Sequence, residues 1–282
     1  MNFLLALVLM ASASPGAVVV RPVANMYSGP SEDADVVSQA IYGASLVLVE
    51  GKNEWVKVRT PDDCTGWMPL ASLRRYGPGD HPYASAGKAA QVESLFANVY
   101  REPDVTKHQP VLTLPFEARL EVVVERENDG GRWIEVRLPD ERSAWIQRGD
   151  VDLNPRPRSG KETIELAKRF LGLTYLWGGT SSFGFDCSGF TQMLVRRRGV
   201  EMPRDADLQA AWEGVVPVTR NKLRAGDLLF FAESPQRITH TGMYIGHGKF
   251  IHDTTRGHPG VQISRLADPP WTKLLVACRR LK

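Results

Sequence analysis

An internal repeat in the first half of the chain limits the possible folds more than any other feature. Residues 24–27 (ANMY) return at 97–100 as ANVY, and residues 55–59 (WVKVR) return at 133–137 as WIEVR. In both copies a Pro-Asp pair and then a tryptophan followed by an apolar residue come next. Self-similarity at a fixed spacing indicates two copies of one supersecondary unit. The sequence therefore predicts two small domains of the same fold.

Each copy has the pattern of short β-strands. Alternating runs rich in Leu and Val, at 46–49 and 120–124, precede the Trp-x-x-Val segments, and β-branched and aromatic residues of this kind favour strands. We expect a small barrel from each copy. An early tyrosine, a Trp-x-x-Val strand and a late Gly-Trp-apolar strand resemble the bacterial SH3-like domains that are attached to cell-wall enzymes. We expect these domains at 16–77 and 84–154, separated by a linker rich in proline and glycine.

A third domain is predicted at 158–282. The proline-rich segment 154–160 ends the second repeat, and residues 162–171 then carry apolar side chains at helical spacing. Further along, a helical pattern after Asp186 is followed by several apolar strand patterns. The fold class of this third domain is therefore α+β.

Composition and the N-terminus narrow the class of protein. The 282 residues are 43% hydrophobic and 24% charged, as expected for a folded chain, and the net charge of +3 is not gathered in basic blocks. We therefore expect no nucleic-acid partner. Residues 1–15 contain a short apolar run followed by Ala11-Ser12-Ala13, which is typical of a signal peptide. This run is too short to span a bilayer, so the sequence predicts an exported protein, periplasmic or extracellular, with no integral membrane segment after processing.

The chain has only three cysteines, Cys64, Cys187 and Cys278. An odd number in an exported protein leaves at least one thiol unpaired, and that thiol is a candidate nucleophile. The sequence leaves open whether Cys64 and Cys278 form a disulfide.

Cys187 is the strongest candidate nucleophile, because its neighbours are polar or very small. Asp186 has the chemistry of a helix N-cap, which would place Cys187 in the first helical turn. The helix dipole and the free backbone N–H groups at this position favour a thiolate and can stabilise an oxyanion. The sequence therefore predicts a thiol that is ready to attack.

His240 is the predicted general base, and His252 is predicted to orient it. The two histidines lie in neighbouring strand patterns, 240–246 and 250–253, joined by the turn 247–249. A hairpin of these strands sets the two rings side by side, which fixes the tautomer of the base. His247 and His258 have turn-like surroundings, and we expect them to be solvated.

Three motifs together resemble the NlpC/p60 cysteine peptidases: DCSGF at 186–190, HTGMYIG at 240–246 and FIH at 250–252. The lead-in of Tyr175 and Trp177-Gly178-Gly179 also fits that family. The resemblance implies a papain-like α+β catalytic domain with the residues Cys187, His240 and His252. It further implies hydrolysis of the bond between D-Glu and a diamino acid in murein peptides, without a metal or cofactor.

Two SH3-like domains ahead of such a domain resemble the γ-D-glutamyl-L-diamino acid endopeptidases, whose substrates are murein stem peptides with a free N-terminal L-Ala. This resemblance implies that Asp186 and Asp205 hold the substrate's ammonium and that Trp177 and Ser188 line its pocket. Ala206 departs from the serine often found there, which puts one polar contact in doubt. The resemblance also implies an aromatic residue from the first SH3-like domain in the pocket, without deciding between Tyr27 and Trp67. Diaminopimelate and lysine both stay open as the third residue of the substrate.

Several other interpretations stay open. Asp205 has the chemistry of a simple helix N-cap, and Trp177 that of a core residue. Cys187 could join His240, His252 and His258 in a zinc site, although no compact ligand spacing supports it. The chain could also be a general peptidoglycan hydrolase, an amidase or an acyltransferase on the same fold, or a wall-binding protein without activity.

Overall fold

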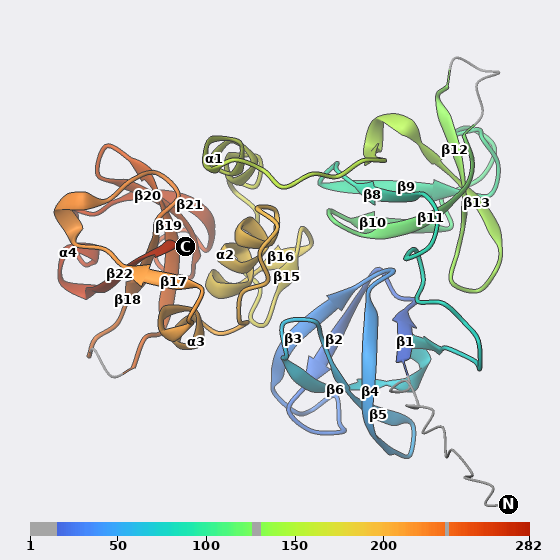
Figure 1. The fold of residues 1–282 in the computed structure, drawn as a ribbon, viewed down its shortest axis with the longest axis horizontal. Coiled ribbons are helices and arrows are strands. Elements are labelled where there is room, and N and C mark those ends of the chain that lie inside the picture. The colour runs from blue at the N-terminus through green and yellow to red at the C-terminus, as the bar shows by residue number, and fades with distance from the viewer. Residues whose placement is uncertain (1–15, 126–130, 235–236) are drawn as a thin grey trace, which may run out of the picture.

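The structure is a computed structural model that describes residues 16–125, 131–234 and 237–282. The predicted signal peptide, residues 1–15, lies outside the described residues. Figure 1 shows three parts along the chain: two β-sheets from the N-terminal half, and a part with helices and a third large sheet from the C-terminal half. Among the described residues, no helix is both long and apolar enough to cross a membrane.

The first sheet has seven antiparallel strands in the order β3-β2-β6-β5-β4-β1-β7. Its elements are β1 (Gly16–Val19), β2 (Val23–Tyr27), β3 (Val36–Ile41), β4 (Ser45–Lys52), β5 (Trp55–Arg59), β6 (Thr65–Pro69), the 3₁₀ helix η1 (Leu70–Ser72) and β7 (Leu73–Arg75). Alternating strand residues such as Met26, Val58 and Met68 form its buried core.

The second sheet repeats this strand order as β10-β9-β13-β12-β11-β8-β14. Its elements are β8 (Ala89–Val92), β9 (Phe96–Tyr100), β10 (Leu112–Pro115), β11 (Arg119–Glu125), β12 (Trp133–Arg137), β13 (Ser143–Gln147), the 3₁₀ helix η2 (Arg148–Asp150) and β14 (Val151–Asp152). It has a separate core, with Val99, Leu120 and Ile146 among its members.

The repeated aromatic residues occupy equivalent places in the two sheets. Tyr27 meets Trp55 edge to face, with ring centroids 5.6 Å apart and an interplanar angle of 84°. Tyr100 meets Trp133 in the same way, at 5.5 Å and 88°. The predicted duplication is therefore present in both the topology and the packing.

The C-terminal part contains a six-stranded antiparallel sheet in the order β17-β22-β18-β19-β20-β21. Its elements are α1 (Gly160–Lys168), β15 (Thr180–Ser181), β16 (Gly184–Phe185), α2 (Cys187–Arg196), α3 (Ala206–Ala211), β17 (Val215–Pro217), the 3₁₀ helix η3 (Arg220–Lys222), β18 (Leu228–Phe231), β19 (His240–Gly246), β20 (Lys249–Thr254), β21 (Gly260–Arg265), α4 (Trp271–Leu274) and β22 (Leu275–Leu281). The predicted opening helix is α1, which starts at a capping box formed by Ser159 and Glu162.

The two faces of this sheet bury different cores. On one face, Phe190 of α2 packs with Phe230, Met243 and Ile251 of the strands. On the other face, Trp271 of α4 packs against Phe231 and Phe250. The apolar face of α2 therefore packs into the core on this face of the sheet, and this packing holds the helix against the strands.

Ion pairs and hydrogen bonds join the second sheet to the C-terminal part. Glu117 accepts from Arg196 of α2 at 2.6 Å. Glu93 pairs with Arg158, with Arg169 at 3.3 Å and with Arg197 at 2.9 Å. The second sheet is thus fixed to α2 and to the segment around α1.

All three cysteines are free thiols. Cys64 is half-buried near the end of the first sheet, and Cys278 is buried in β22 of the third. The disulfide that the sequence left open is not formed.

Candidate active site

Cys187 is the first residue of α2, as predicted. Asp186 precedes the helix in an extended conformation, and its side chain accepts a hydrogen bond from the Gly189 N–H at 2.7 Å. This is the N-cap that the sequence indicated. Only 8% of Cys187 is exposed.

Close backbone contacts explain the glycines around Cys187. A Cβ on Gly189 would lie 2.1 Å from the Gly179 carbonyl oxygen, so α2 can approach the preceding loop only without a side chain there. Gly178 has a φ of +74°, and a Cβ on it would lie 2.6 Å from Val36 of β3. The Gly-Gly turn is therefore the point where the nucleophile's helix, its lead-in loop and the first sheet meet.

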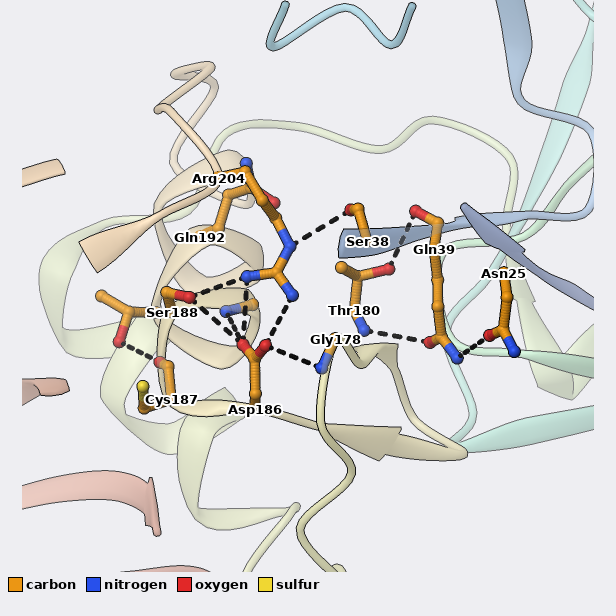
Figure 2. Close-up of polar contacts among 12 residues, drawn as sticks. Asn25, Ser38, Gln39, Gly178, Thr180, Asp186, Cys187, Ser188, Gln192 and Arg204 are labelled. Carbon is orange, nitrogen blue, oxygen red and sulfur yellow. Dashed lines mark hydrogen bonds and ion pairs between the residues drawn. The ribbon is translucent and has the colours of Figure 1, made fainter. Parts of the chain in front are cut away.

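The Asp186 carboxylate accepts from five donors within the protein (Figure 2). Arg204 binds it through both terminal nitrogens, at 3.1 and 2.6 Å, and Ser188 donates from its hydroxyl at 3.2 Å. The N–H groups of Gly178 and Gly189 complete the set at 3.1 and 2.7 Å. A carboxylate offers about four lone-pair directions, so this one is saturated.

The substrate contacts predicted for Asp186 and Ser188 remain predictions. Ser188 is buried, and its hydroxyl also accepts from Arg204 at 2.7 Å. The described hydrogen bonds thus assign both side chains to holding the start of α2.

His240 and His252 lie side by side on the β19–β20 hairpin, as the sequence predicted. The register of the hairpin pairs Met243 with Ile251 and brings His240 Nε2 to 2.8 Å from His252 Nδ1. His240 Nδ1 is the ring nitrogen that this hydrogen bond does not use.

Two residues that the sequence analysis missed support the histidine pair. The Ser264 hydroxyl lies 2.9 Å from His252 Nε2. Trp271 stacks on His240, with centroids 5.3 Å apart, and meets His252 edge to face. Strand alternation in β21 was a usable signal for Ser264, whereas nothing local in the sequence pointed to Trp271.

Burial keeps the thiol and the imidazole uncharged. It raises the pKa of Cys187 to about 12, and the nearby Asp186 carboxylate adds to this rise. Burial, with a smaller effect from Arg256, lowers the pKa of His240 to about 3, and burial also lowers the pKa of His252. The predicted shift toward a thiolate is therefore wrong for the free protein, because loss of hydration outweighs the helix N-terminus.

Backbone groups nevertheless point at the sulfur. The N–H groups of Thr241 and Ser188 interact with Cys187 and lower the pKa of its thiol, against the effect of burial. Cys187 Sγ lies 3.9 Å from the Thr239 carbonyl oxygen. The Cys187 sulfur thus lies between the start of α2 and the start of β19.

Trp177 and Asp205 have free side chains near this site. Trp177 is 70% exposed, so it is not a core residue. Asp205 occupies the N-cap position of α3, but its side chain makes no capping hydrogen bond. No hydrogen bond or ion pair joins its carboxylate to any described residue, and partial burial raises its pKa.

His247 and His258 are exposed in turns, as expected. Within residues 16–125, 131–234 and 237–282, no three His, Cys, Asp or Glu side chains form a group that could hold a metal ion. Cys187, the half-buried His240 and the buried His252 are therefore not arranged as zinc ligands.

Two sets of hydrogen bonds join the site to the first sheet (Figure 2): one comes from Arg204, and the other is a chain that starts at Thr180. Ser38 of β3 accepts from Arg204 at 3.1 Å, and Gln39 accepts from the Thr180 N–H at 3.1 Å. Asn25 links Gln39, at 2.9 Å, to the Tyr27 hydroxyl, at 3.3 Å. This chain reaches Tyr27, but it does not decide whether Tyr27 or Trp67 would meet a ligand.

A cavity of about 1000 Å³ lies behind α2, between the two N-terminal sheets and the C-terminal part. Its lining includes Gln192 and Arg196, which bind Asp62 and Glu117 from the two sheets, and it does not include Cys187 or the histidines. The cavity therefore lies at the junction of the three parts and is separate from the site formed by Cys187, His240 and His252.

Comparisons with known proteins agree with this arrangement. The NlpC/P60 family model matches residues 172–280, and the bacterial SH3 domain model matches residues 22–73. Proteins named gamma-D-glutamyl-L-lysine dipeptidyl-peptidase from Bacillus cereus and Bacillus subtilis are 31% and 30% identical to this chain. The alignments cover 86% and 89% of this chain, and 74% and 83% of those proteins.

A solved structure extends the likeness to the whole fold. The crystal structure of an NlpC/P60 family protein from Bacillus cereus matches with a TM-score of 0.79 and 27% identity. The match covers 94% of this chain and 99% of that one, so it spans both N-terminal sheets and the C-terminal part.

Proposed function

Because this chain belongs to the NlpC/P60 family, we propose that it is a cysteine peptidase that cleaves the γ-D-glutamyl–diamino acid bond of murein stem peptides. The observation that carries this proposal is the arrangement of Cys187 at the start of α2 with the hydrogen-bonded pair His240 and His252. Two relatives are named for the γ-D-glutamyl-L-lysine bond, which supports the substrate class.

The proposed reaction starts from a neutral thiol and a neutral imidazole. The Cys187 proton passes to His240 as the sulfur attacks the γ-carbonyl carbon of D-Glu, because burial disfavours a separated ion pair beforehand. The His240 imidazolium then protonates the leaving amine as the C–N bond breaks. His240 next takes a proton from water, which hydrolyses the thioester and restores the thiol. His252 holds the His240 ring in place throughout.

We further propose that the substrate has a free N-terminal L-Ala. Asp205 supports this, because its partly buried carboxylate makes no hydrogen bond or ion pair with a described residue, whereas Asp186 is saturated by internal donors. A charge-assisted hydrogen bond from an ammonium to Asp205 would select a free amine over an acylated one. The exposed Trp177 would form an apolar wall beside it.

The proposal includes a role for both N-terminal sheets. The second sheet repeats the strand order of the first, which supports two SH3-like barrels at 16–77 and 84–154 ahead of a catalytic domain at 158–282. Because the first sheet contacts Gly178, Thr180 and Arg204, it would narrow the site toward short peptides.

Mass spectrometry of products tests this function. The protein is incubated with L-Ala-γ-D-Glu-diaminopimelate, with the corresponding lysine peptide and with the N-acetylated form of each. We expect release of L-Ala-D-Glu from the free peptides only. Equal cleavage of the acetylated peptides would replace the free-amine proposal with a general wall hydrolase, and no cleavage of any peptide would contradict the peptidase.

Two variants sharpen this test. Cys187→Ala removes the nucleophile, and we expect no turnover with an unchanged thermal melting curve. Asp205→Asn removes the charge but keeps the size, and we expect it to reduce the preference for the free amine roughly tenfold or more. Asp207→Asn, on the exposed side of the same helix, is the matched control.

A murein substrate also supports export to the periplasm or beyond the cell. Sequencing the N-terminus of the mature protein tests this, because a signal peptide at 1–15 would be missing from it.

A further inference from the structure

Asp253 is a buried carboxyl group beside the active site that the proposed mechanism does not use. It directly follows His252 in β20 and is fully buried. Neither carboxyl oxygen has a hydrogen-bond partner among the described residues. The Thr254 N–H lies close enough to favour the charged form slightly, but it forms no hydrogen bond with the carboxyl group. An orphaned buried acid of this kind is costly, so its location is informative.

Strand alternation directs Asp253 toward the nucleophile's helix. The His252 ring packs with Phe250 and Trp271 on one face of the sheet. Asp253 therefore lies on the opposite face with Ile251, which packs in the same core as Phe190 of α2.

Thr241 of β19 lies on the same face of the sheet as Asp253. The register pairs Met243 with Ile251, and strand alternation places Thr241 on the face of Met243 and Asp253 on the face of Ile251. The Thr241 hydroxyl is also buried without a partner among the described residues, and its N–H interacts with the Cys187 sulfur. Asp253 thus adjoins a residue in direct contact with the thiol.

The titratable groups that face Asp253 come from α2 and from the loop before it. Asp186 is the charged group that acts on Asp253. Tyr175 is influenced by Cys187, Asp186 and Asp253 together, so these four groups share one region. The positive charge of Arg204 is already bound to Asp186, and no cation pairs with Asp253 among the described residues.

We propose that Asp253 is a protonated, neutral acid in the active enzyme and that its ionisation, which puts a negative charge beside Cys187, sets the alkaline limit of activity. Asp253 acts through the thiol, so it is a positioning residue and not a catalytic one. This inference rests on the proposed role of Cys187 but not on the identity of the substrate.

The expected direction follows from burial and from like charge. Burial, helped by the Asp186 carboxylate, raises the pKa of Asp253 to about 8. Below that pH the group carries no charge and leaves the thiol unaffected. Above it, a carboxylate near the sulfur disfavours the thiolate and opposes attack.

Alkylation of Cys187 tests the proposal without any substrate. Full-length wild type and Asp253→Asn are treated with iodoacetamide over a range of pH, and mass spectrometry of peptides gives the rate at Cys187. Asparagine has the shape of the neutral acid and cannot ionise. We expect equal rates near pH 6.5, and near pH 9.5 we expect a rate roughly tenfold higher in the variant, as for a thiol pKa lowered by about one unit. Cys64, which directly precedes β6 of the first sheet, is the internal control.

Three outcomes would overturn the proposal. The first is a variant-to-wild-type rate ratio that does not change with pH. The second is slower alkylation of the folded variant at every pH. The third is a higher KM of the variant near pH 6.5 with a cleavable peptide. Such an increase would mean that the charged Asp253 carboxylate binds the substrate at this pH, whereas the proposal makes Asp253 neutral there. Asp253→Ser, checked by circular dichroism, repeats the measurement if the asparagine variant does not fold. If no peptide is cleaved but alkylation behaves as expected, the proposed substrate fails and this inference stands.

Discussion

Asp186 and Asp253 both lie near the Cys187 thiol, yet their surroundings give them opposite characters. The Asp186 carboxylate accepts five hydrogen bonds, two of which come from the Arg204 guanidinium. Asp253 receives no hydrogen bond from any described residue, and burial favours its neutral form. At the scale of single residues, hydrogen-bond partners and hydration therefore decide whether an aspartate side chain favours its charged or its neutral form.

Ser264→Ala tests the support of the histidine pair. Losing the hydroxyl that lies 2.9 Å from His252 Nε2 frees the ring to rotate, and we expect kcat to fall roughly tenfold with little change in KM. Steady-state kinetics on the cleaved peptide measure this. Ser264→Thr keeps a hydroxyl and should retain most of the activity. Gln262→Ala, two residues away on the same strand, is the control, and an equal loss there would show that the effect is not specific to the histidine.

The sequence was most informative for features of the site that depend on residues close together along the chain. The N-cap at Asp186 and the hairpin that joins His240 to His252 are both local, so both were predicted and both are present. Ser264 and Trp271 reach the histidines through tertiary contacts and were missed. The protonation state of Cys187 was predicted wrongly, because burial comes from the whole fold and a sequence motif does not report it.

At the scale of elements, the start of α2 is held by side chains from outside the helix. Arg204 lies just before α3 and binds both Asp186 of the N-cap and Ser38 of β3. Both charges of the Arg204–Asp186 pair are almost fully buried, with 4% and 10% of their side chains exposed. The helix that begins at Cys187 therefore depends on an ion pair that helix propensity does not predict.

Arg204→Met tests this dependence. Removing one partner leaves the Asp186 charge buried and unpaired, which costs about 3–5 kcal/mol of unfolding free energy. Urea denaturation of the full chain measures the change. Arg142→Met is the control, because Arg142 and its partner Asp140 are 66% and 48% exposed and such pairs contribute under about 1 kcal/mol. Equal effects of the two substitutions would contradict the importance of burial.

Element boundaries in the C-terminal part followed the sequence pattern closely. The strand predicted at 240–246 is β19 with the same bounds, and the helix after Asp186 is α2. The glycines of the DCSG and Gly-Gly motifs could be noted but not explained from sequence. Their reason is the close approach of Gly179 to Gly189, which joins two separate elements.

At the scale of the whole molecule, polar contacts tie both N-terminal sheets to the catalytic part. Glu93 of the second sheet pairs with three arginines from the C-terminal part, and Gln39 of the first sheet binds Thr180. The repeat predicted two similar domains, but the repeated residues do not predict how these domains attach to the C-terminal part. It depends on residues such as Gln39 and Glu93 that lie at the surfaces of the sheets.

Glu93→Gln tests the attachment of the second sheet. Removing the charge that Arg158, Arg169 and Arg197 share should raise the population of detached molecules. We expect trypsin to cut the exposed segment around Arg156 roughly fivefold faster, because cleavage follows the open population. Glu102→Gln, whose partners Lys107 and His108 lie within the second sheet's own loops, should leave the rate unchanged. An unchanged rate in Glu93→Gln would contradict the attachment.

The packing of Val36 against Gly178 bears on how a chain like this can change during evolution. Val36 fills the space that a Cβ on Gly178 would need, and Ser38 from the same strand completes the shell of Arg204. A recombination event that exchanged the first sheet for an unrelated module would remove both contacts at once and disturb the helix that begins at Cys187. The N-terminal half is therefore expected to be inherited together with the peptidase half, and the two halves to accumulate substitutions in step across their shared surface.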